Sequence, residues 1–283
     1  MPGATAMTTR KSVHDLQELA RQARVAVLNM TYDAGSGHPG GSFSMQDFLV
    51  ALYHNHFDMS PERVDDPDRD VFILSKGHCA PGLYAVLGEL GYYDKKEFRR
   101  LRRLGGLLQG HVDRKIPGIE MSTGSLGMGL GFANGVALAK RMGGHKGKVV
   151  CVLGDGELQE GNIWESAMTA PHHKLDNVWC IVDWNKVQID GPCKDVKNIE
   201  PVADKFEAFG WHVISADGHD MKAIETAYEA AEAAEGPVCI VFDTKKGGGV
   251  SFMEGKADFH GRALKKDEMV AAMKELNEPW EAA

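Results

Sequence analysis

Five short apolar runs lie along the chain, separated by segments whose apolar residues recur at helical spacing. The runs cover residues 70–75, 147–155, 175–185, 211–218 and 236–245. The last four are continuous, as expected of strands that are covered on both faces. Helices are expected over 12–34, from about Pro81, and roughly over 159–171, 201–209 and 220–235. This alternation predicts βαβ units and therefore an α/β domain in which a parallel sheet carries helices on both faces.

Length and charge limit the domain organisation and the class of partner. The chain has 283 residues, 43% of them hydrophobic, which is enough for a sizeable core. We expect a flexible leader over residues 1–11 and a single domain over 12–283. The net charge is −8 and no basic patch is dense, which argues against a nucleic-acid partner. The most basic run, residues 95–103, is predicted to be a solvated helix face, with a contact to a partner or an anion as the alternative.

Several features bear on the location of the protein. No apolar stretch reaches the ~18 residues that a membrane span needs. Residues 1–11 also lack the apolar core of a signal peptide. The five cysteines are odd in number and contain no C-x-x-C pair. We therefore expect reduced thiols in a cytoplasmic protein with no membrane partner.

Polar residues end two consecutive apolar runs. Asp155 stands between two glycines at the end of one run, and Asn185 ends the next. Because the carboxyl ends of parallel strands meet at one edge of a sheet, their oxygen atoms are expected side by side. A carboxylate and an amide oxygen suit a Mg²⁺ ion that takes further ligands from a phosphate group and water. The alternative is structural, with Asp155 capping the next helix and Asn185 in a turn before Gly191.

Glycine is concentrated in a few loops. The 33 glycines gather mainly at 35–42, 124–135, 154–156 and 245–251. Such loops let backbone N–H groups approach and surround an anion. The segment 124–135 has no G-x-G-x-x-G register, and the chain has no G-x-x-x-x-G-K-[ST]. Dinucleotide and P-loop sites are therefore disfavoured.

Histidine forms a second pattern. Three histidines follow a glycine and a fourth precedes one: His38, His78, His111 and His260. A lone histidine is often structural, but four at such steps in separate loops favour a function. The histidines within 54–56 and 172–173 fit no zinc motif and are predicted to lie on the surface. No G-x-S-x-G elbow occurs, which argues against a hydrolase nucleophile.

The segments GDGELQEGNIWESA (154–167) and VDWNKVQIDG (182–191) together resemble the thiamine-diphosphate motif of transketolases. The resemblance continues in the same order through SGHPGGSFSM (36–45), ILSKGHCAPGLYA (73–85), STGSLGMGLGFANGVALA (122–139) and FHGRALK (259–265). It implies the diphosphate-binding domain of the thiamine-diphosphate-binding fold. Transketolases continue into a pyrimidine-binding and a C-terminal domain, whereas this chain stops at Ala283. The resemblance thus implies the N-terminal subunit of a split transketolase, with the family's activating glutamate on a partner chain.

The resemblance also implies roles, position by position. Mg²⁺ is expected on the side chains of Asp155 and Asn185 and on the carbonyl of Val187, with Asn185 also at the cofactor. The remaining cofactor neighbours are expected to be Gly156, whose N–H faces the diphosphate, then His78, His260, Glu165 and the loop Gly124, Ser125 and Leu126. A proline is common in the family where Ser125 stands. The catalytic set is His38, His111 and His260, which contact substrate hydroxyls and move protons, with Glu160. Glu160 and Glu165 match glutamates at the subunit interface that link paired cofactors.

The implied activity is transfer of a two-carbon ketol unit from a ketose phosphate to an aldose phosphate. This activity requires thiamine diphosphate, Mg²⁺ and the partner chain. The expected assembly is a heterotetramer with two copies of each chain, and the expected pathway is the pentose phosphate pathway. The segment 126–139 is the expected apolar contact with that partner. One alternative is a split enzyme for another ketose, such as a sulfonated or branched sugar. The other is a non-catalytic cofactor-binding subunit.

Overall fold

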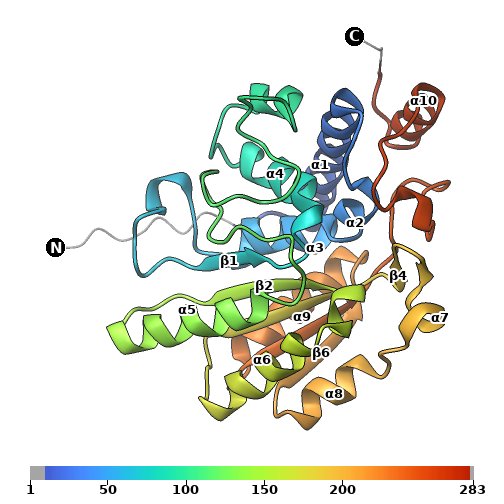
Figure 1. Cartoon of the computed structure of the whole chain (residues 1–283). Coiled ribbons are helices and arrows are strands. Elements are labelled where there is room, and N and C mark those ends of the chain that lie inside the picture. Colours follow the sequence, from blue (N-terminus) through green and yellow to red (C-terminus); the bar gives the residue numbers. More distant parts are fainter. Residues whose placement is uncertain (1–9, 281–283) are drawn as a thin grey trace.

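A five-stranded parallel sheet forms the centre of the computed structural model, which describes residues 10–280 (Figure 1). The strand order is β1–β2–β3–β7–β6, and every neighbouring pair is parallel. The strands are β1 (Val71–Leu74), β2 (Val149–Gly154), β3 (Val178–Trp184), β6 (His212–Asp217) and β7 (Val238–Asp243), with a separate antiparallel pair, β4 (Val187–Gln188) and β5 (Gly191–Pro192). The α/β class and the five predicted strands are confirmed. Most of the predicted leader, residues 1–9, lies outside the described residues.

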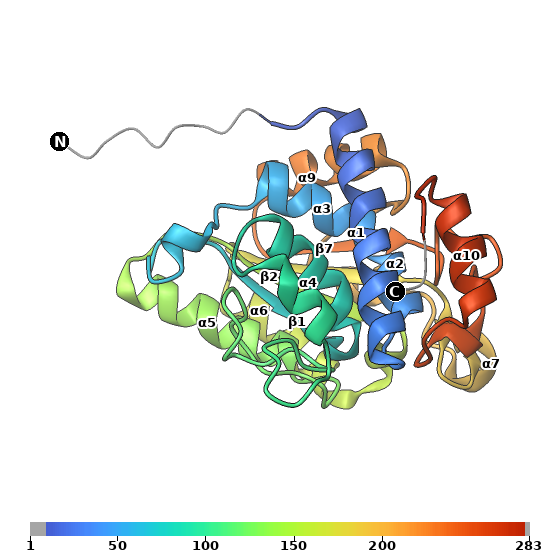
Figure 2. The same cartoon turned by 90° about the horizontal axis from the view of Figure 1, so that it is seen from above.

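Helices cover both faces of this sheet (Figures 1 and 2). The α-helices are α1 (Val13–Ala34), α2 (Pro39–Ser44), α3 (Gln46–Ala51), α4 (Ala80–Glu89), α5 (Gly129–Gly143), α6 (Gly161–His172), α7 (Cys193–Lys197), α8 (Val202–Ala208), α9 (Met221–Ala233) and α10 (Lys266–Glu275). The 3₁₀ turns are η2 (Pro61–Arg63), η3 (Gly77–Cys79), η4 (Lys95–Arg100), η5 (Gly156–Gln159) and η6 (Ala257–Phe259), and η1 (Leu52–His56) is a π-helical turn. Apolar residues of α1, α3, α4, α9 and α10 pack on one face, and those of α5, α6 and α8 pack on the other.

Strand alternation divides the core between the two faces. In β1, Phe72 and Leu74 belong to the cluster under α1 and α4, whereas Val71 and Ile73 belong to the cluster under α5 and α6. Successive side chains of a strand point to opposite faces, so a strand buried on both sides must be apolar throughout. This explains the continuous apolar runs of the central strands.

Strand β6 is covered by α9 on one face and α8 on the other, as predicted, but it is less buried than the central strands. It pairs only with β7 at the edge of the sheet, and none of its six residues is buried. A continuous apolar run therefore did not distinguish this edge strand from the central ones.

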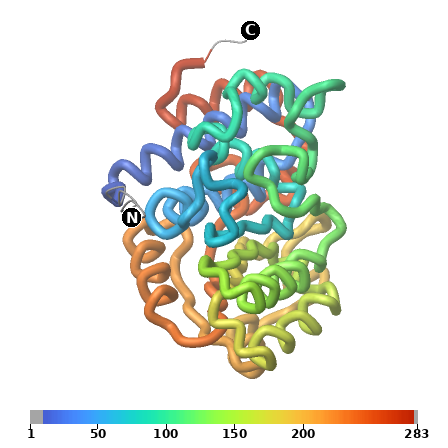
Figure 3. Tube along the Cα trace, turned by 90° about the vertical axis from the view of Figure 1, so that its left-hand side faces the viewer, coloured from blue at the N-terminus to red at the C-terminus, as the bar shows by residue number. Residues whose placement is uncertain are grey.

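The first helix begins and ends where its sequence indicates. Ser12 caps α1 through its hydroxyl, which accepts the Asp15 N–H at 3.2 Å, and Asp15 accepts the Ser12 N–H in return. Such a cap contributes roughly 1 kcal/mol. Gly35 ends the helix at φ 63°, where glycine costs least. The C-terminal α10 lies beside α1 (Figures 2 and 3), and Arg21 donates to the Leu276 carbonyl at 2.7 Å.

The prediction that the histidines within 54–56 lie on the surface is wrong for His56. Its ring is buried, and its two nitrogens lie 2.9 Å from a Glu232 oxygen and 3.2 Å from a Glu225 oxygen. Both glutamates come from α9, so the contact ties the end of η1 to that helix. Both glutamates are far from His56 in the sequence, so the local pattern could not reveal them as its partners.

The sheet places four polar residues at one edge. Lys76 follows β1, Asp155 follows β2, Asn185 follows β3 and Lys246 follows β7. Parallel strands bring all four carboxyl ends to the same side. Along residues 10–280, no helix is long and apolar enough to cross a membrane.

Candidate active site

A cavity of about 370 Å³ lies at the carboxyl edge of the sheet. Its walls come from the loops after the strands and from the glycine-rich loops singled out in the sequence. The lining residues are His38, Gly41, Lys76, His78, His111, Gly124, Leu126, Gly154, Asp155, Gly156, Glu157, Gln159, Glu160, Asn185, Val187, Gln188, Ile189, Asp190, Lys246 and His260. A larger cavity of about 520 Å³ lies between α1, α4 and η4, away from these loops.

The structure brings together most of the residues selected from the sequence. All four glycine-flanked histidines line the cavity, as do Asp155, Asn185, Val187, Gly156, Glu160, Gly124 and Leu126. Two of the selected residues do not: Ser125, which is exposed before α5, and Glu165, which is exposed on α6. Gly124 has φ 155°, and a Cβ there would lie 3.0 Å from the His111 ring. The loop therefore needs glycine to approach that histidine.

Asp155 is only partly satisfied. The side chain is 4% exposed, and its Oδ1 accepts the N–H of Gly156 at 2.7 Å, so the predicted helix cap is present on η5. Its Oδ2 is buried and has no hydrogen-bond partner among the described residues. Burial and the nearby Asp183 carboxylate raise the pKa of Asp155 to about 6. A buried carboxylate oxygen without a donor is costly, and a bound cation would remove that cost.

The neighbouring oxygens fit a Mg²⁺ ion whose remaining ligands come from outside the chain. Asn185 turns its Oδ1 toward the Val187 N–H at 3.2 Å, and its Nδ2 toward Asp183 at 3.4 Å. The Val187 carbonyl accepts a hydrogen bond from Lys246 Nζ at 2.9 Å. Within residues 10–280, no group of three or more His, Cys, Asp or Glu side chains is arranged for a metal. One carboxylate, one amide and one backbone carbonyl match the sparse donor set of a magnesium ion that shares a phosphate group and waters.

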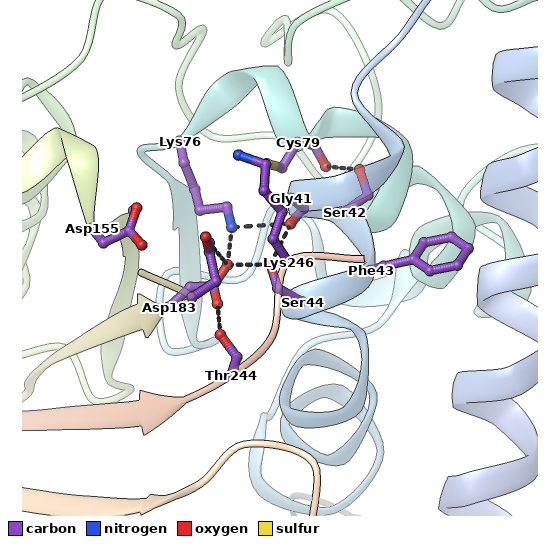
Figure 4. Close-up of polar contacts among 12 residues, drawn as sticks. Gly41, Ser42, Phe43, Ser44, Lys76, Cys79, Asp155, Asp183, Thr244 and Lys246 are labelled. Carbon is purple, nitrogen blue, oxygen red and sulfur yellow. Dashed lines mark hydrogen bonds and ion pairs between the residues drawn. The ribbon is translucent and has the colours of Figure 1, made fainter. Parts of the chain in front are cut away.

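A second buried carboxylate lies on β3 beside this donor set (Figure 4). Asp183 is fully buried, pairs with Lys76, and accepts hydrogen bonds from the hydroxyls of Ser44, at 2.6 Å, and Thr244. Lys76 Nζ also donates to the Gly41 carbonyl at 3.0 Å. Burial disfavours both charges, but the attraction between them is the larger effect. It raises the pKa of Lys76 and lowers that of Asp183. This network ties α2 to the ends of β1, β3 and β7.

The four histidines form one cluster. The ring centroid of His38 lies 5.2 Å from that of His78, 5.8 Å from His111 and 5.5 Å from His260. His78 and His260 are stacked at 5.0 Å. The Nδ1 of His38 is buried without a partner among the described residues. The cluster therefore presents polar ring atoms that are free for a ligand.

The environment keeps these rings neutral. Burial, together with nearby cations, lowers the pKa of His38 to about 4 and that of His260 to about 3. The pKa of His78 is also lowered by burial and by Lys76, and that of His111 by burial and Arg102. At neutral pH, each ring can donate from one nitrogen and accept at the other.

Sequence reasoning missed four charged residues of this site: Lys76, Asp183, Lys246 and Glu157. Lys246 Nζ lies 2.8 Å from His260 Nδ1. Glu157 is buried and accepts the N–H groups of Gly127, at 2.9 Å, and Gly154, at 3.0 Å. A charged residue within or directly after an apolar strand was the available signal, since such a residue is rarely buried unless it is paired.

Comparisons with known proteins agree with this arrangement. Residues 16–281 match the family described as the transketolase, thiamine diphosphate binding domain. The chain is 43% identical to the 6-deoxy-6-sulfo-D-fructose transketolase subunit SqwG of Clostridium sp. (strain MSTE9), over 93% of this chain and 96% of that protein. It is 38% identical to an apulose-4-phosphate transketolase subunit of Actinobacillus succinogenes, over 94% of this chain and 98% of that protein.

A solved structure shows the same fold. The transketolase of Campylobacter jejuni superposes with a TM-score of 0.90 at 32% identity, over 95% of this chain but 43% of that chain. The chain therefore spans less than half of that transketolase and nearly the whole of the two subunits.

Proposed function

The chain belongs to the family of transketolase thiamine-diphosphate-binding domains, and from this premise we propose that it is the N-terminal subunit of a two-chain transketolase. The proposed reaction moves a two-carbon ketol unit from a ketose phosphate to an aldose phosphate, with thiamine diphosphate and Mg²⁺. The observation that carries the proposal is a single cavity that joins an unpartnered, buried Asp155 oxygen to four histidines. A cytoplasmic location and a role in the pentose phosphate pathway stay predictions.

The strand-end residues are proposed to hold the cofactor. Asp155 and Asn185 would bind Mg²⁺ through side-chain oxygens and Val187 through its carbonyl, which Lys246 engages in this structure. The Gly156 N–H, which donates a hydrogen bond to Asp155 Oδ1 in this structure, would donate to the diphosphate instead. When bound, thiamine diphosphate supplies the carbanion chemistry that cleaves a carbon–carbon bond of the ketose.

The histidine cluster is proposed to handle the substrate. His38, His111 and His260 would hydrogen-bond hydroxyl groups and hold or move protons near the reacting carbon, while His78 would orient the cofactor. Neutral imidazoles suit both tasks, because one nitrogen donates while the other accepts. Glu160 also lines the cavity, at the start of α6, and would link the site to the second one in the assembly.

An apolar face beside the cavity supports the proposal that a partner chain binds there. Along α5 and the residue before it, Met128 is 48% exposed, Phe132 40% and Met142 85%, and Met168 on the neighbouring α6 is 51% exposed. Glu165 is exposed on the same helix. We propose that this face, defined by Met128, Phe132, Met142 and Met168, contacts the partner that carries the pyrimidine-binding domain. It overlaps the segment 126–139 expected from the sequence, and the assembly would contain two copies of each chain.

The test compares the chain alone with the chain coexpressed with that partner. Ketol transfer is expected only from the complex, whose mass would correspond to two copies of each chain. Phe132→Asp should prevent copurification, because a charge would be buried in the interface. Val270→Asp is the control, since Val270 is 51% exposed on α10, away from this face. Robust activity of the chain alone would refute the two-chain proposal.

A second candidate function differs only in the substrate. The similarity to the 6-deoxy-6-sulfo-D-fructose transketolase subunit favours a sulfonated ketose as donor, and the similarity to the apulose-4-phosphate transketolase subunit favours apulose 4-phosphate as a substrate. Comparing kcat/KM for phosphorylated, sulfonated and branched ketoses in the assembled enzyme decides between them. If the complex binds cofactor but transfers no ketol unit from any donor, the chain is a non-catalytic cofactor-binding subunit.

A further inference from the structure

A glycine-rich loop carries Lys246 into the cavity. The loop, residues 245–250, follows β7. Lys246 is 2% exposed, and its Nζ lies 2.9 Å from the Val187 carbonyl oxygen and 2.8 Å from His260 Nδ1. Val187 is a proposed Mg²⁺ ligand, and His260 belongs to the histidine cluster. The position of this buried ammonium therefore depends on how the backbone of the loop is held.

His219 holds that backbone from outside the cavity. It lies between β6 and α9, and its Nε2 accepts the N–H of Lys245 at 2.9 Å. The ring also packs on Gly248, where a Cβ would lie 2.7 Å from Nε2. On the other side of Lys246 in the sequence, Gly247 donates its N–H to a carbonyl oxygen of α2 at 2.9 Å. A hydrogen bond thus fixes the backbone of both residues that flank the lysine.

Two buried residues fix the His219 ring in turn. Its Nδ1 lies 2.8 Å from an Asp47 oxygen, and the Asp47 carboxylate also pairs with Arg24. Arg24 donates to the Gly248 carbonyl at 2.9 Å. Arg24 lies on α1 and Asp47 on α3, so the loop is braced against the helices on one face of the sheet. Burial alone would raise the pKa of Asp47, but Arg24 and His219 lower it to about 2, and the carboxylate is charged at neutral pH.

These contacts assign one tautomer to His219. A carboxylate can only accept, so Nδ1 carries the hydrogen that faces Asp47. The backbone N–H of Lys245 can only donate, so Nε2 must accept. In this tautomer the ring links a buried ion pair to the backbone directly before Lys246. Contacts of this kind orient the residues of a cofactor or metal site without touching the ligand.

We infer that His219 is a positioning residue that holds Lys246 in the cavity. The inference rests on the proposed function, in which Val187 faces Mg²⁺ and His260 faces the cofactor and the substrate. Without the Nε2 contact, the N–H of Lys245 loses this partner, and the loop can carry the ammonium away from both of its neighbours. Less positive charge would then lie beside the bound diphosphate, whose affinity should fall.

The first test separates the two nitrogens of the ring. Glutamine reaches the position of Nε2, whereas asparagine is shorter and reaches only that of Nδ1. In the full chain without cofactor, amide hydrogen exchange of residues 245–250 should be about 5- to 10-fold faster in His219→Asn and change less than about twofold in His219→Gln. Exchange in β3 should not change, which shows that the fold is intact. His145→Asn is the matched control, since His145 faces Asp68 at 3.4 Å on the surface, away from this loop.

The second test asks whether His219 acts through Lys246. In the assembled complex, His219→Asn should weaken Mg²⁺-dependent binding of thiamine diphosphate about 10-fold, and His219→Gln should stay within about threefold of the wild type. In a Lys246→Met background, His219→Asn should change the affinity less than about twofold, because the group that it positions is already gone. Calorimetry measures the affinity of each variant.

Two results would overturn the inference. One is unchanged exchange of the loop in His219→Asn. The other is an undiminished effect of His219→Asn on cofactor affinity in the Lys246→Met background, which would mean that His219 acts by another route. If the wild-type complex binds no thiamine diphosphate, the proposed function fails instead, and the exchange of the loop still decides whether His219 holds it.

Discussion

Asp155 and Asp183 are two buried carboxylates at the ends of adjacent strands, and they differ in how completely the chain satisfies them. Asp183 pairs with Lys76 and accepts two hydroxyl hydrogen bonds, which keeps its pKa low. Asp155 has one backbone donor on Oδ1 and none on Oδ2 among the described residues, and its pKa is raised to about 6. Both aspartates are buried, but Asp155 lines the cavity whereas Asp183 does not. The chain itself satisfies the Asp183 carboxylate, and we propose that a ligand satisfies Asp155.

The largest effect is expected when Asp183 loses its charge. Asp183→Asn leaves the Lys76 ammonium buried without a counterion, which should lower the free energy of unfolding by about 3–5 kcal/mol. Urea unfolding measures this. Asp243→Asn is the matched control, because Asp243 pairs with Lys186 at the surface and should cost less than about 1 kcal/mol.

A double variant isolates the pair from the hydroxyl contacts. Lys76→Met with Asp183→Asn removes both charges and should be less destabilised than Asp183→Asn alone, because no uncompensated ion remains. If the double variant is as unstable as the sum of the two single variants, the pair is not what stabilises this end of the cavity.

Asp155 should behave in the opposite way. At pH 4, Asp155→Ala is expected to leave the free energy of unfolding of the ligand-free chain nearly unchanged, because the raised pKa of Asp155 keeps the wild-type carboxyl protonated in the folded state. In the assembled complex it should weaken Mg²⁺-dependent binding of thiamine diphosphate at least about 100-fold, since a charged metal ligand is lost. Calorimetry with and without Mg²⁺ measures this, with Asp195→Ala, an exposed carboxylate of α7, as control. Unchanged affinity would remove Asp155 from the metal site.

The same two aspartates show how far the sequence could be interpreted. Asp155 was selected because it ends an apolar run between two glycines, and Asn185 because it ends the next run. Both positions follow from where the predicted strands end along the chain. Asp183 was missed because its partner Lys76 is 107 residues away, in the loop after β1, a strand that does not pair with β3. Local patterns carry no information about such a pairing.

Other outcomes have the same explanation. The four glycine-flanked histidines could be selected because each marks a loop at the same edge of the sheet. His56 looked like a surface residue because nothing near it in the sequence reveals the α9 glutamates that bind both of its nitrogens. Strand β6 looked buried because its edge position depends on the order of the sheet. Ser125 and Glu165 lie outside the cavity lining, and their roles stay predictions that require the partner chain.

The smallest expected effect is also the one that separates the two aspartates most directly: their contributions to stability should change with pH in opposite directions. Asp155 has a folded pKa of about 6, above the ordinary value of 3.8. Its contribution is therefore fully present below pH 3.8 and is lost as the pH rises through 6, because the folded state then has to bury an unpaired charge. Asp183 has a lowered pKa, so its contribution is present above pH 3.8 and is lost at lower pH.

In metal-free buffer, the difference in unfolding free energy between Asp155→Asn and the wild-type chain should grow by about 1–2 kcal/mol in favour of the variant from pH 4 to pH 7. The neutral amide avoids the charge that wild-type Asp155 acquires over this range. For Asp183→Asn, the disadvantage relative to the wild type should shrink as the pH falls below 4, because wild-type Asp183 then loses its charge as well. Urea unfolding at several pH values measures both differences. Parallel pH dependences of the two variants would mean that the two carboxylates share one environment, and Asp155 would then have no distinct need for a bound cation.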